Sequence, residues 1–365
     1  LKECKKMLSA YSESYSQARQ MFLAVCENRK LEYFSVINPN LGPDGEELAV
    51  DVALLGDPAA ENILYVTSGV HGVEGYFGSA VLIGQLSSGF MPPKGVRCVL
   101  VHAVNPWGFA HCRRFTEENV DLNRNFWVER NFSAENKQYG LVKDWAEIAD
   151  LSEQAIETAE TAGKQLVEDI GIPRMKIALA GGQDINPQGL FFVGHGATWA
   201  RVAFEYIVYR TLGQIKIAFH MDLHTGLGPT GYADILSHYA ENDERLETLV
   251  TYLGEAASSQ RRITEIGQEL RGALGDGLNR ILSRRNVNFL GVSIEVGTQE
   301  LYLSLDALRY ECALHFDQNP THPRAATIKQ NLRDAFYVTT DAWKSMAYDQ
   351  TDEYLRGAIR YLSDQ

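Results

Sequence analysis

Two short segments supply side chains of the kind that bind a catalytic metal ion. His71 and Glu74 lie three residues apart in the glycine-rich stretch GVHGVEG, and His224 stands in the segment DLHTG. Two imidazoles and one carboxylate form a known catalytic zinc set whose fourth position stays open for water. Other divalent ions also accept these ligands. We therefore expect one metal ion per chain, with Zn²⁺ as the assigned cofactor, bound by His71, Glu74 and His224.

Two aspartates are candidates for orienting these histidines. Asp121 begins the segment DLNRNF, and Asp222 precedes His224 by two residues. A zinc-bound histidine usually donates its free N–H to a carboxylate, which fixes the ring. We assign this role to Asp121. For Asp222 the same role and that of a solvent-facing turn residue are equally supported.

Basic and amide side chains near Asp121 could hold a substrate. Asn123 and Arg124 together suit a carboxylate, which arginine can bind with two parallel hydrogen bonds. Upstream, Arg113 and Arg114 could bind substrate, and one of them could stabilise the oxyanion that forms when water attacks a carbonyl. We assign the role of stabilising this oxyanion to Arg114. The sequence does not decide between the two, and either could instead pair with nearby glutamates at the surface.

Glu295 is the candidate general base. It stands in the apolar run VSIEVG, and a buried carboxylate is costly unless it is paired or used. Such a group could take a proton from metal-bound water and pass it to the leaving amine. The alternative is a structural glutamate in a salt bridge. With the three metal ligands, Glu295 makes the chain a predicted metallohydrolase.

These residues need a scaffold that brings distant segments together. Apolar runs predict strands, and helical spacing predicts helices between them. The expected strands are 32–38, 49–55, 62–67, 96–104, 215–223 and 289–296, and the expected helices are 14–27, 76–88, 139–168, 198–212, 242–259 and 277–285. This alternation predicts an α/β fold with a mixed, largely parallel sheet covered by helices on both faces. The candidate residues would then lie at strand ends, where such sheets bind ligands.

One domain covering residues 1–365 is the preferred organisation. The motifs lie within 60–300, an insertion covers about 127–214, and the part from about 303 to 365 is helical. The net charge of −13 argues against nucleic acid, and no apolar run is long enough to span a bilayer. Five scattered cysteines without a CxxC pair favour a reducing compartment, so we expect a cytoplasmic protein. Secretion stays an alternative because the chain begins at Leu1, without Met.

Together the segments resemble the zinc carboxypeptidase superfamily, and most of all its aspartoacylase and succinylglutamate desuccinylase branch and related carboxypeptidase-like metallopeptidases of unknown function. The resemblance is carried by Gly69–Gly75, Asn105-Pro106, Arg114, Asp121–Phe126, Asp222–Thr225 and Glu295–Gly297. It implies the roles assigned above: zinc ligands, general base, carboxylate clamp, carbonyl-polarising arginine and histidine-orienting aspartate. The tyrosine that digestive carboxypeptidases place upstream of the base is missing, since no tyrosine occurs between Tyr252 and Tyr302. Tyr232 or Tyr239 could replace it, and His195 could line the pocket.

The resemblance implies a hydrolase that cleaves an amide bond next to a free carboxylate. A carboxypeptidase-like metallopeptidase acting on small peptides is favoured by the segment DLNRNF together with Thr225-Gly226. The alternative enzyme is a deacylase of N-acyl amino acids, and the alternative class is a binding module without turnover. A homo-oligomer is compatible with the sequence.

Overall fold

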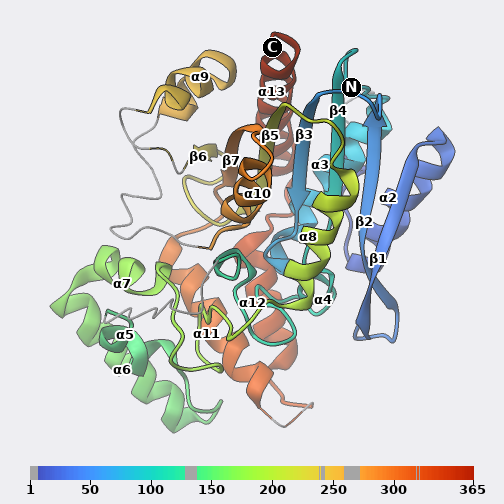
Figure 1. Ribbon diagram of the computed structural model, residues 1–365. Coiled ribbons are helices and arrows are strands. Elements are labelled where there is room, and N and C mark those ends of the chain that lie inside the picture. The colour runs from blue at the N-terminus through green and yellow to red at the C-terminus, as the bar shows by residue number, and fades with distance from the viewer. Residues whose placement is uncertain are drawn as a thin grey trace.

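One mixed sheet forms the centre of the molecule (Figure 1). In the computed structural model, residues 7–127, 138–237, 239, 243–258, 272–317, 319 and 321–365 are described. Within them, seven strands follow the order β1-β2-β4-β3-β5-β7-β6. Their bounds are β1 Glu32–Leu41, β2 Glu47–Gly56, β3 Asn62–Ser68, β4 Val96–His102, β5 Ile217–Thr225, β6 Ala233–Leu236 and β7 Asn288–Val296. The four central strands run parallel, whereas β1, β2 and β6 pair antiparallel, so the expected mixed α/β fold is confirmed.

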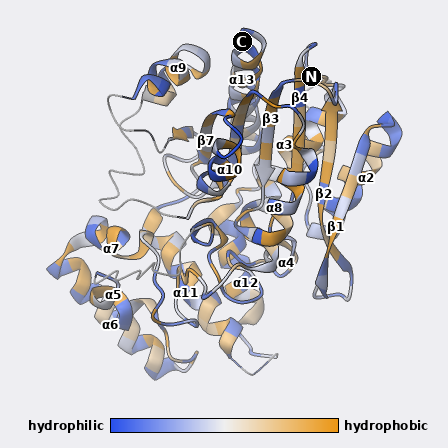
Figure 2. Ribbon diagram, viewed as in Figure 1, coloured by the Kyte–Doolittle hydropathy of each residue, from blue (hydrophilic) through white to orange (hydrophobic). Residues whose placement is uncertain are grey.

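Helices cover both faces of the sheet, as expected (Figure 1). On one face lie α2 (Tyr15–Arg29), α3 (Gly75–Ser88) and α13 (Asp341–Ser363). On the other face lie α8 (Trp199–Thr211) and α10 (Leu274–Ser283). Inner strands are apolar on both sides, as Figure 2 shows along β2 and β4, because helices remove both faces from water, whereas the edge strand β1 is largely exposed.

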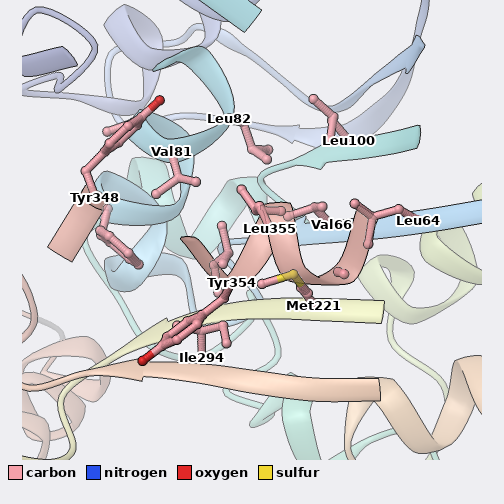
Figure 3. Packing of buried hydrophobic residues seen from close by; sticks show 14 of the residues in the cluster. Leu64, Val66, Val81, Leu82, Leu100, Met221, Ile294, Tyr348, Tyr354 and Leu355 are labelled. Atoms are coloured by element: carbon pink, nitrogen blue, oxygen red, sulfur yellow. The ribbon is translucent and has the colours of Figure 1, made fainter. Parts of the chain in front are cut away.

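Alternation along each strand divides the core into two layers. Leu64 and Val66 of β3 face α3 and α13, whereas Ile63 and Tyr65 face the opposite layer. Figure 3 shows the first layer, in which strand residues contact side chains of α3 and α13. The labelled residues are Leu64, Val66, Leu100, Met221, Ile294, Val81, Leu82, Tyr348, Tyr354 and Leu355.

A third group of helices lies beside the sheet, at the end where the candidate residues gather (Figure 1). It combines α5 (Tyr139–Ala146), α6 (Glu153–Asp169) and α7 (Gly171–Ala180) with α11 (Leu301–Phe316) and α12 (Ala325–Phe336). The first three belong to the proposed insertion 127–214, of which 128–137 lie outside the described residues. Buried side chains of α5 and α7 form one apolar cluster with those of α11 and α12, and Ala162 and Leu166 of α6 pack against it, so distant parts of the chain build this unit together.

Several element boundaries differ from the predictions. The single helix predicted over 139–168 is two helices, because α5 ends at Ala146 and the hydroxyl of Ser152 caps a new helix, α6. Neither α7 nor the short edge strand β6 was predicted. In the predicted helix 242–259, α9 covers Glu244–Leu253, and residues 242 and 259 lie outside the described part. No described helix is both long and apolar enough to cross a membrane.

The turn after β3 shows why glycine is needed beside the candidate metal ligands. Gly69 adopts a positive φ of 65°, and the chain then enters the short 3-10 helix η1 (Gly72–Glu74), which leads into α3. At Gly72 an added Cβ would lie 2.1 Å from the carbonyl carbon of Gly108 in α4 (Pro106–Ala110). Only a residue without a side chain allows this approach.

We therefore expect Gly72→Ala to destabilise the protein by about 1–3 kcal/mol, because one backbone must move away from the other. Chemical denaturation of the metal-free protein would measure this change. Gly140→Ala is the matched control, since Gly140 is exposed in α5 and has no atom within 4 Å of its added Cβ. Equal stability of both variants would show that the turn is not tightly packed.

Candidate active site

The predicted metal ligands converge at the carboxyl ends of neighbouring strands. His71 and Glu74 belong to the turn after β3, and His224 lies near the end of β5, which pairs with β3. Glu295 lies on β7 directly beside His224, because the two residues are partners in the β5–β7 register. Parallel strands end at one edge of the sheet, so residues 150 positions apart meet there.

Two ring nitrogens and one carboxylate face a common point. The Nδ1 atoms of His71 and His224 are 3.3 Å apart. Oε1 of Glu74 is 2.9 Å from Nδ1 of His71, and Oε2 is 3.0 Å from Nδ1 of His224. Ligands at about 2.0–2.1 Å from a tetrahedral zinc ion would be about 3.3–3.4 Å apart, close to this spacing. All three side chains are buried, so the residues fit a divalent metal ion.

A separate aspartate orients each imidazole. Nε2 of His71 is 3.2 Å from Oδ1 of Asp121, and Nε2 of His224 is 2.7 Å from Oδ2 of Asp222. Ionised carboxylates only accept hydrogen bonds, so each Nε2 carries the proton. The geometry also decides the alternative left open for Asp222, which is 2% exposed and is therefore not a solvent-facing turn residue.

The charge balance of this cluster also favours a divalent cation. The cluster holds three carboxylates and one guanidinium: Glu74 and Asp121 pair with Arg114, whereas Asp222 pairs with His224. With neutral imidazoles two negative charges remain, which one divalent ion would neutralise. Burial lowers the pKa of His224, but Asp222 and Glu74 outweigh it and raise that pKa well above its usual value. A proton therefore supplies positive charge here when no metal does, and metal binding would release it.

The adjacent residues Arg113 and Arg114 point to different places. Arg114 donates to Oε1 of Glu74 at 3.2 Å and to Oδ2 of Asp121 at 3.1 Å, and it lines the central cavity. In contrast, Arg113 donates to Glu311 at 2.8 Å and to Asn119 at 2.9 Å, and it does not line that cavity. The geometry is compatible with the role assigned to Arg114. It corrects the substrate-binding role assigned to Arg113, because Glu311 and Asn119 draw that guanidinium into the protein interior.

A cavity that opens to solvent lies beside the cluster, and the empty space in it and at its mouth together is about 910 Å³. Asn123 and Arg124, from the 3-10 helix η2 (Leu122–Arg124), line it. The guanidinium of Arg124 donates to the backbone oxygens of Ala180 at 2.9 Å and of Asn123 at 2.8 Å. No carboxylate of the described residues forms an ion pair with it, although Arg124 is only 6% exposed. A buried cation that contacts only neutral oxygens is suited to receive a substrate carboxylate.

Glu295 is distinct among the carboxylates of the cavity. Its Oε2 atom is buried and has no hydrogen-bond partner, and the side chain lines the cavity. Burial raises its pKa to about 8, against the opposing effect of His224 and with a further rise from Glu74. The alternative of a salt-bridged structural glutamate does not fit an unpaired oxygen, because burial without a partner is costly. This carboxyl group can hold or release a proton near neutral pH.

The cavity also has walls that the motifs did not predict. One helical face of α11 supplies Leu301, Ser304, Leu305 and Leu308, and α7 supplies Lys176, Leu179 and Ala180. The spacing of the α11 residues is a helical repeat, but the sequence does not tell a core face from a cavity wall. The three further candidates, Tyr232, Tyr239 and His195, do not line this cavity.

The model of one protein family, described as "Protein of unknown function (DUF2817)", matches residues 11–350. No curated protein gave a significant match to the sequence. Among solved structures, bovine thrombin-activatable fibrinolysis inhibitor in complex with tick carboxypeptidase inhibitor is similar, with a TM-score of 0.50 and 10% identity over 97% of this chain and 98% of that chain. Carboxypeptidase A from Helicoverpa armigera has a TM-score of 0.47 and 12% identity over 88% and 74%. The first likeness confirms the carboxypeptidase-like fold.

We expect the wild-type protein to bind one Zn²⁺ per chain and His224→Ala to lose it. Because the ligands converge only in the folded state, zinc at 1,000 times its Kd should stabilise the wild type by about 4 kcal/mol. Elemental analysis after gel filtration and thermal melts with and without zinc would measure both effects. His195→Ala is the control, since His195 is exposed and outside the cluster. Zinc binding that survives His224→Ala would contradict the assigned site.

Proposed function

This chain belongs to the DUF2817 family of proteins of unknown function, and we propose that it is a zinc-dependent hydrolase that cleaves an amide bond next to a free carboxylate. One observation carries the proposal: two imidazole nitrogens and a carboxylate converge beside Glu295, whose Oε2 atom has no hydrogen-bond partner. Zinc bound there would lower the pKa of a bound water to about 7 and polarise the substrate carbonyl.

Glu295 is the proposed proton carrier. Its side chain lines the cavity that also contains the metal ligands, so its carboxylate can accept a proton from the attacking water. It then donates that proton to the nitrogen of the leaving amine. The raised pKa of Glu295 belongs to the protein without a metal ion, and a bound cation would lower it and favour the carboxylate form.

Arg114 and the pair Asn123 and Arg124 are proposed to act on two different parts of the substrate. Arg114 lies beside Glu74, where its charge can stabilise the oxyanion that develops on the scissile carbonyl. Arg124 would bind the free carboxylate of the leaving amino acid, with the amide of Asn123 as a further donor. This carboxylate clamp would place the scissile bond next to the metal.

Within this class we favour a carboxypeptidase-like peptidase over a deacylase of N-acyl amino acids. The carboxypeptidase-like fold and the leucine side chains that line the cavity support a peptide as substrate. Product analysis by mass spectrometry distinguishes the two. A peptidase releases single C-terminal residues from peptides, and a deacylase releases amino acids from N-acyl substrates alone.

The role of Glu295 predicts that Glu295→Gln keeps zinc and substrate affinity but loses about 10²–10⁴-fold in kcat, because the amide cannot carry the proton. Single-turnover kinetics and a zinc competition assay would separate the effects. Glu300→Gln is the control, since Glu300 is exposed and outside the cavity. An unchanged kcat in Glu295→Gln would assign this residue a structural role.

The role of Arg124 predicts loss of carboxylate selectivity. The native enzyme should cleave a peptide with a free C-terminus much faster than its C-terminal amide. In Arg124→Met the kcat/KM for the free acid should fall roughly 10- to 150-fold. This factor corresponds to the loss of about 1.5–3 kcal/mol from charge-assisted hydrogen bonds. The amide should be affected much less. A native enzyme that ignores the carboxylate would remove the basis for this clamp.

A further inference from the structure

A buried threonine continues the chain of hydrogen bonds that begins at His224. Thr67 lies on β3 directly beside Asp222 in the β3–β5 register. Its hydroxyl donates to Oδ1 of Asp222 at 2.5 Å, while Oδ2 of the same carboxylate contacts Nε2 of His224 at 2.7 Å. Nε2 of His220 lies 3.0 Å from the same hydroxyl. Four buried side chains thus form one row: His224, Asp222, Thr67 and His220.

The direction of each hydrogen bond follows from the number of protons. The carboxylate of Asp222 accepts only, so Thr67 must give it the single hydroxyl proton. Towards His220 the Thr67 oxygen can then only accept, and Nε2 of His220 must donate. His220 therefore donates to Thr67, and Thr67 donates to Asp222. From the other side His224 also donates to Asp222. The carboxylate receives hydrogen bonds at both of its oxygens.

The two metal-binding histidines are supported differently. Asp121, the partner of His71, accepts from the guanidinium of Arg114 at 3.1 Å and from the backbone nitrogen of Asn123 at 3.0 Å. Asp222, the partner of His224, has the hydroxyl of Thr67 at its second oxygen and no arginine beside it in the described part of the chain. Without that hydroxyl the second oxygen of Asp222 would be buried and unpaired, which is costly.

We propose that Thr67, supported by His220, is a positioning residue of the metal centre, holding Asp222 so that His224 presents Nδ1 to the metal ion and thereby setting the affinity for that ion. The inference rests on the proposed function only in so far as the cluster binds zinc. The physical reason is that a histidine ligand is fixed by its carboxylate, and this carboxylate is fixed at its other oxygen by Thr67. Thr67 and His220 do not belong to the group of metal-binding side chains, and neither residue lines the substrate cavity.

The test compares Thr67→Val, which keeps the branched shape but removes the hydroxyl, with Thr67→Ser, which keeps the hydroxyl. Zinc Kd would be measured by competition with a chelator of known affinity. Loss of such a partner typically weakens metal binding by about 10- to 100-fold, and we expect about tenfold for Thr67→Val. Thr67→Ser should restore an affinity close to that of the wild type. The visible absorption of Co²⁺-loaded protein should change in Thr67→Val and not in Thr67→Ser.

A structural role alone would give a different pattern. Thr67→Val would then lower the thermal stability of the metal-free protein, while zinc Kd and the Co²⁺ spectrum stayed those of the wild type, and this result would overturn the proposal. If Thr67→Val does not fold, His220→Phe and His220→Gln decide, because only glutamine keeps a donor for Thr67. Equal zinc affinity of His220→Phe and His220→Gln would also overturn the proposed role of Thr67. A wild-type protein that binds zinc but cleaves no amide would contradict the proposed function and leave this test intact.

Discussion

The arrangement of the site depends on two imidazole nitrogens that face each other at 3.3 Å. Because Asp121 and Asp222 accept the protons of the opposite ring nitrogens, both Nδ1 atoms direct lone pairs at one point beside Glu74. Lone pairs and a carboxylate so close together repel one another unless positive charge lies between them. In the protein without metal a proton on His224 supplies this charge, and a divalent ion would supply it more completely.

The sheet makes this convergence a property of the fold. The turn after β3, the end of β5 and the end of β7 meet because these strands are parallel neighbours, and the register sets Glu295 beside His224. Apolar layers on both faces fix the strands, so the polar groups at their ends have little freedom to separate. The helices α7, α11 and α12 then close the cavity with an apolar wall on one side. Rigid support and a half-enclosed cavity are what metal-assisted hydrolysis requires.

Much of this could be predicted from the sequence, because strand ends, glycine turns and metal-binding residue types are local signals. The order of the motifs and the alternation of strands and helices were sufficient for the fold class and for the cluster of His71, Glu74 and His224. The different directions of Arg113 and Arg114 could not be predicted, since they depend on Glu311, which lies 198 positions away from Arg113. The sequence also did not predict the break between α5 and α6, which depends on packing. Nor did it predict that the hydroxyl of Thr67 lies beside Asp222, which depends on strand register.

The proposed chemistry depends on zinc binding between the two Nδ1 atoms and Glu74. Diffraction from zinc-loaded crystals, recorded on both sides of the zinc absorption edge, tests this most directly. We expect one anomalous peak at about 2.0–2.1 Å from Nδ1 of His71 and Nδ1 of His224, and in contact with a Glu74 oxygen. Two results would contradict this binding mode. One is a zinc ion coordinated by the Nε2 atoms, and the other is a zinc ion bound elsewhere while His71, Glu74 and His224 hold no metal.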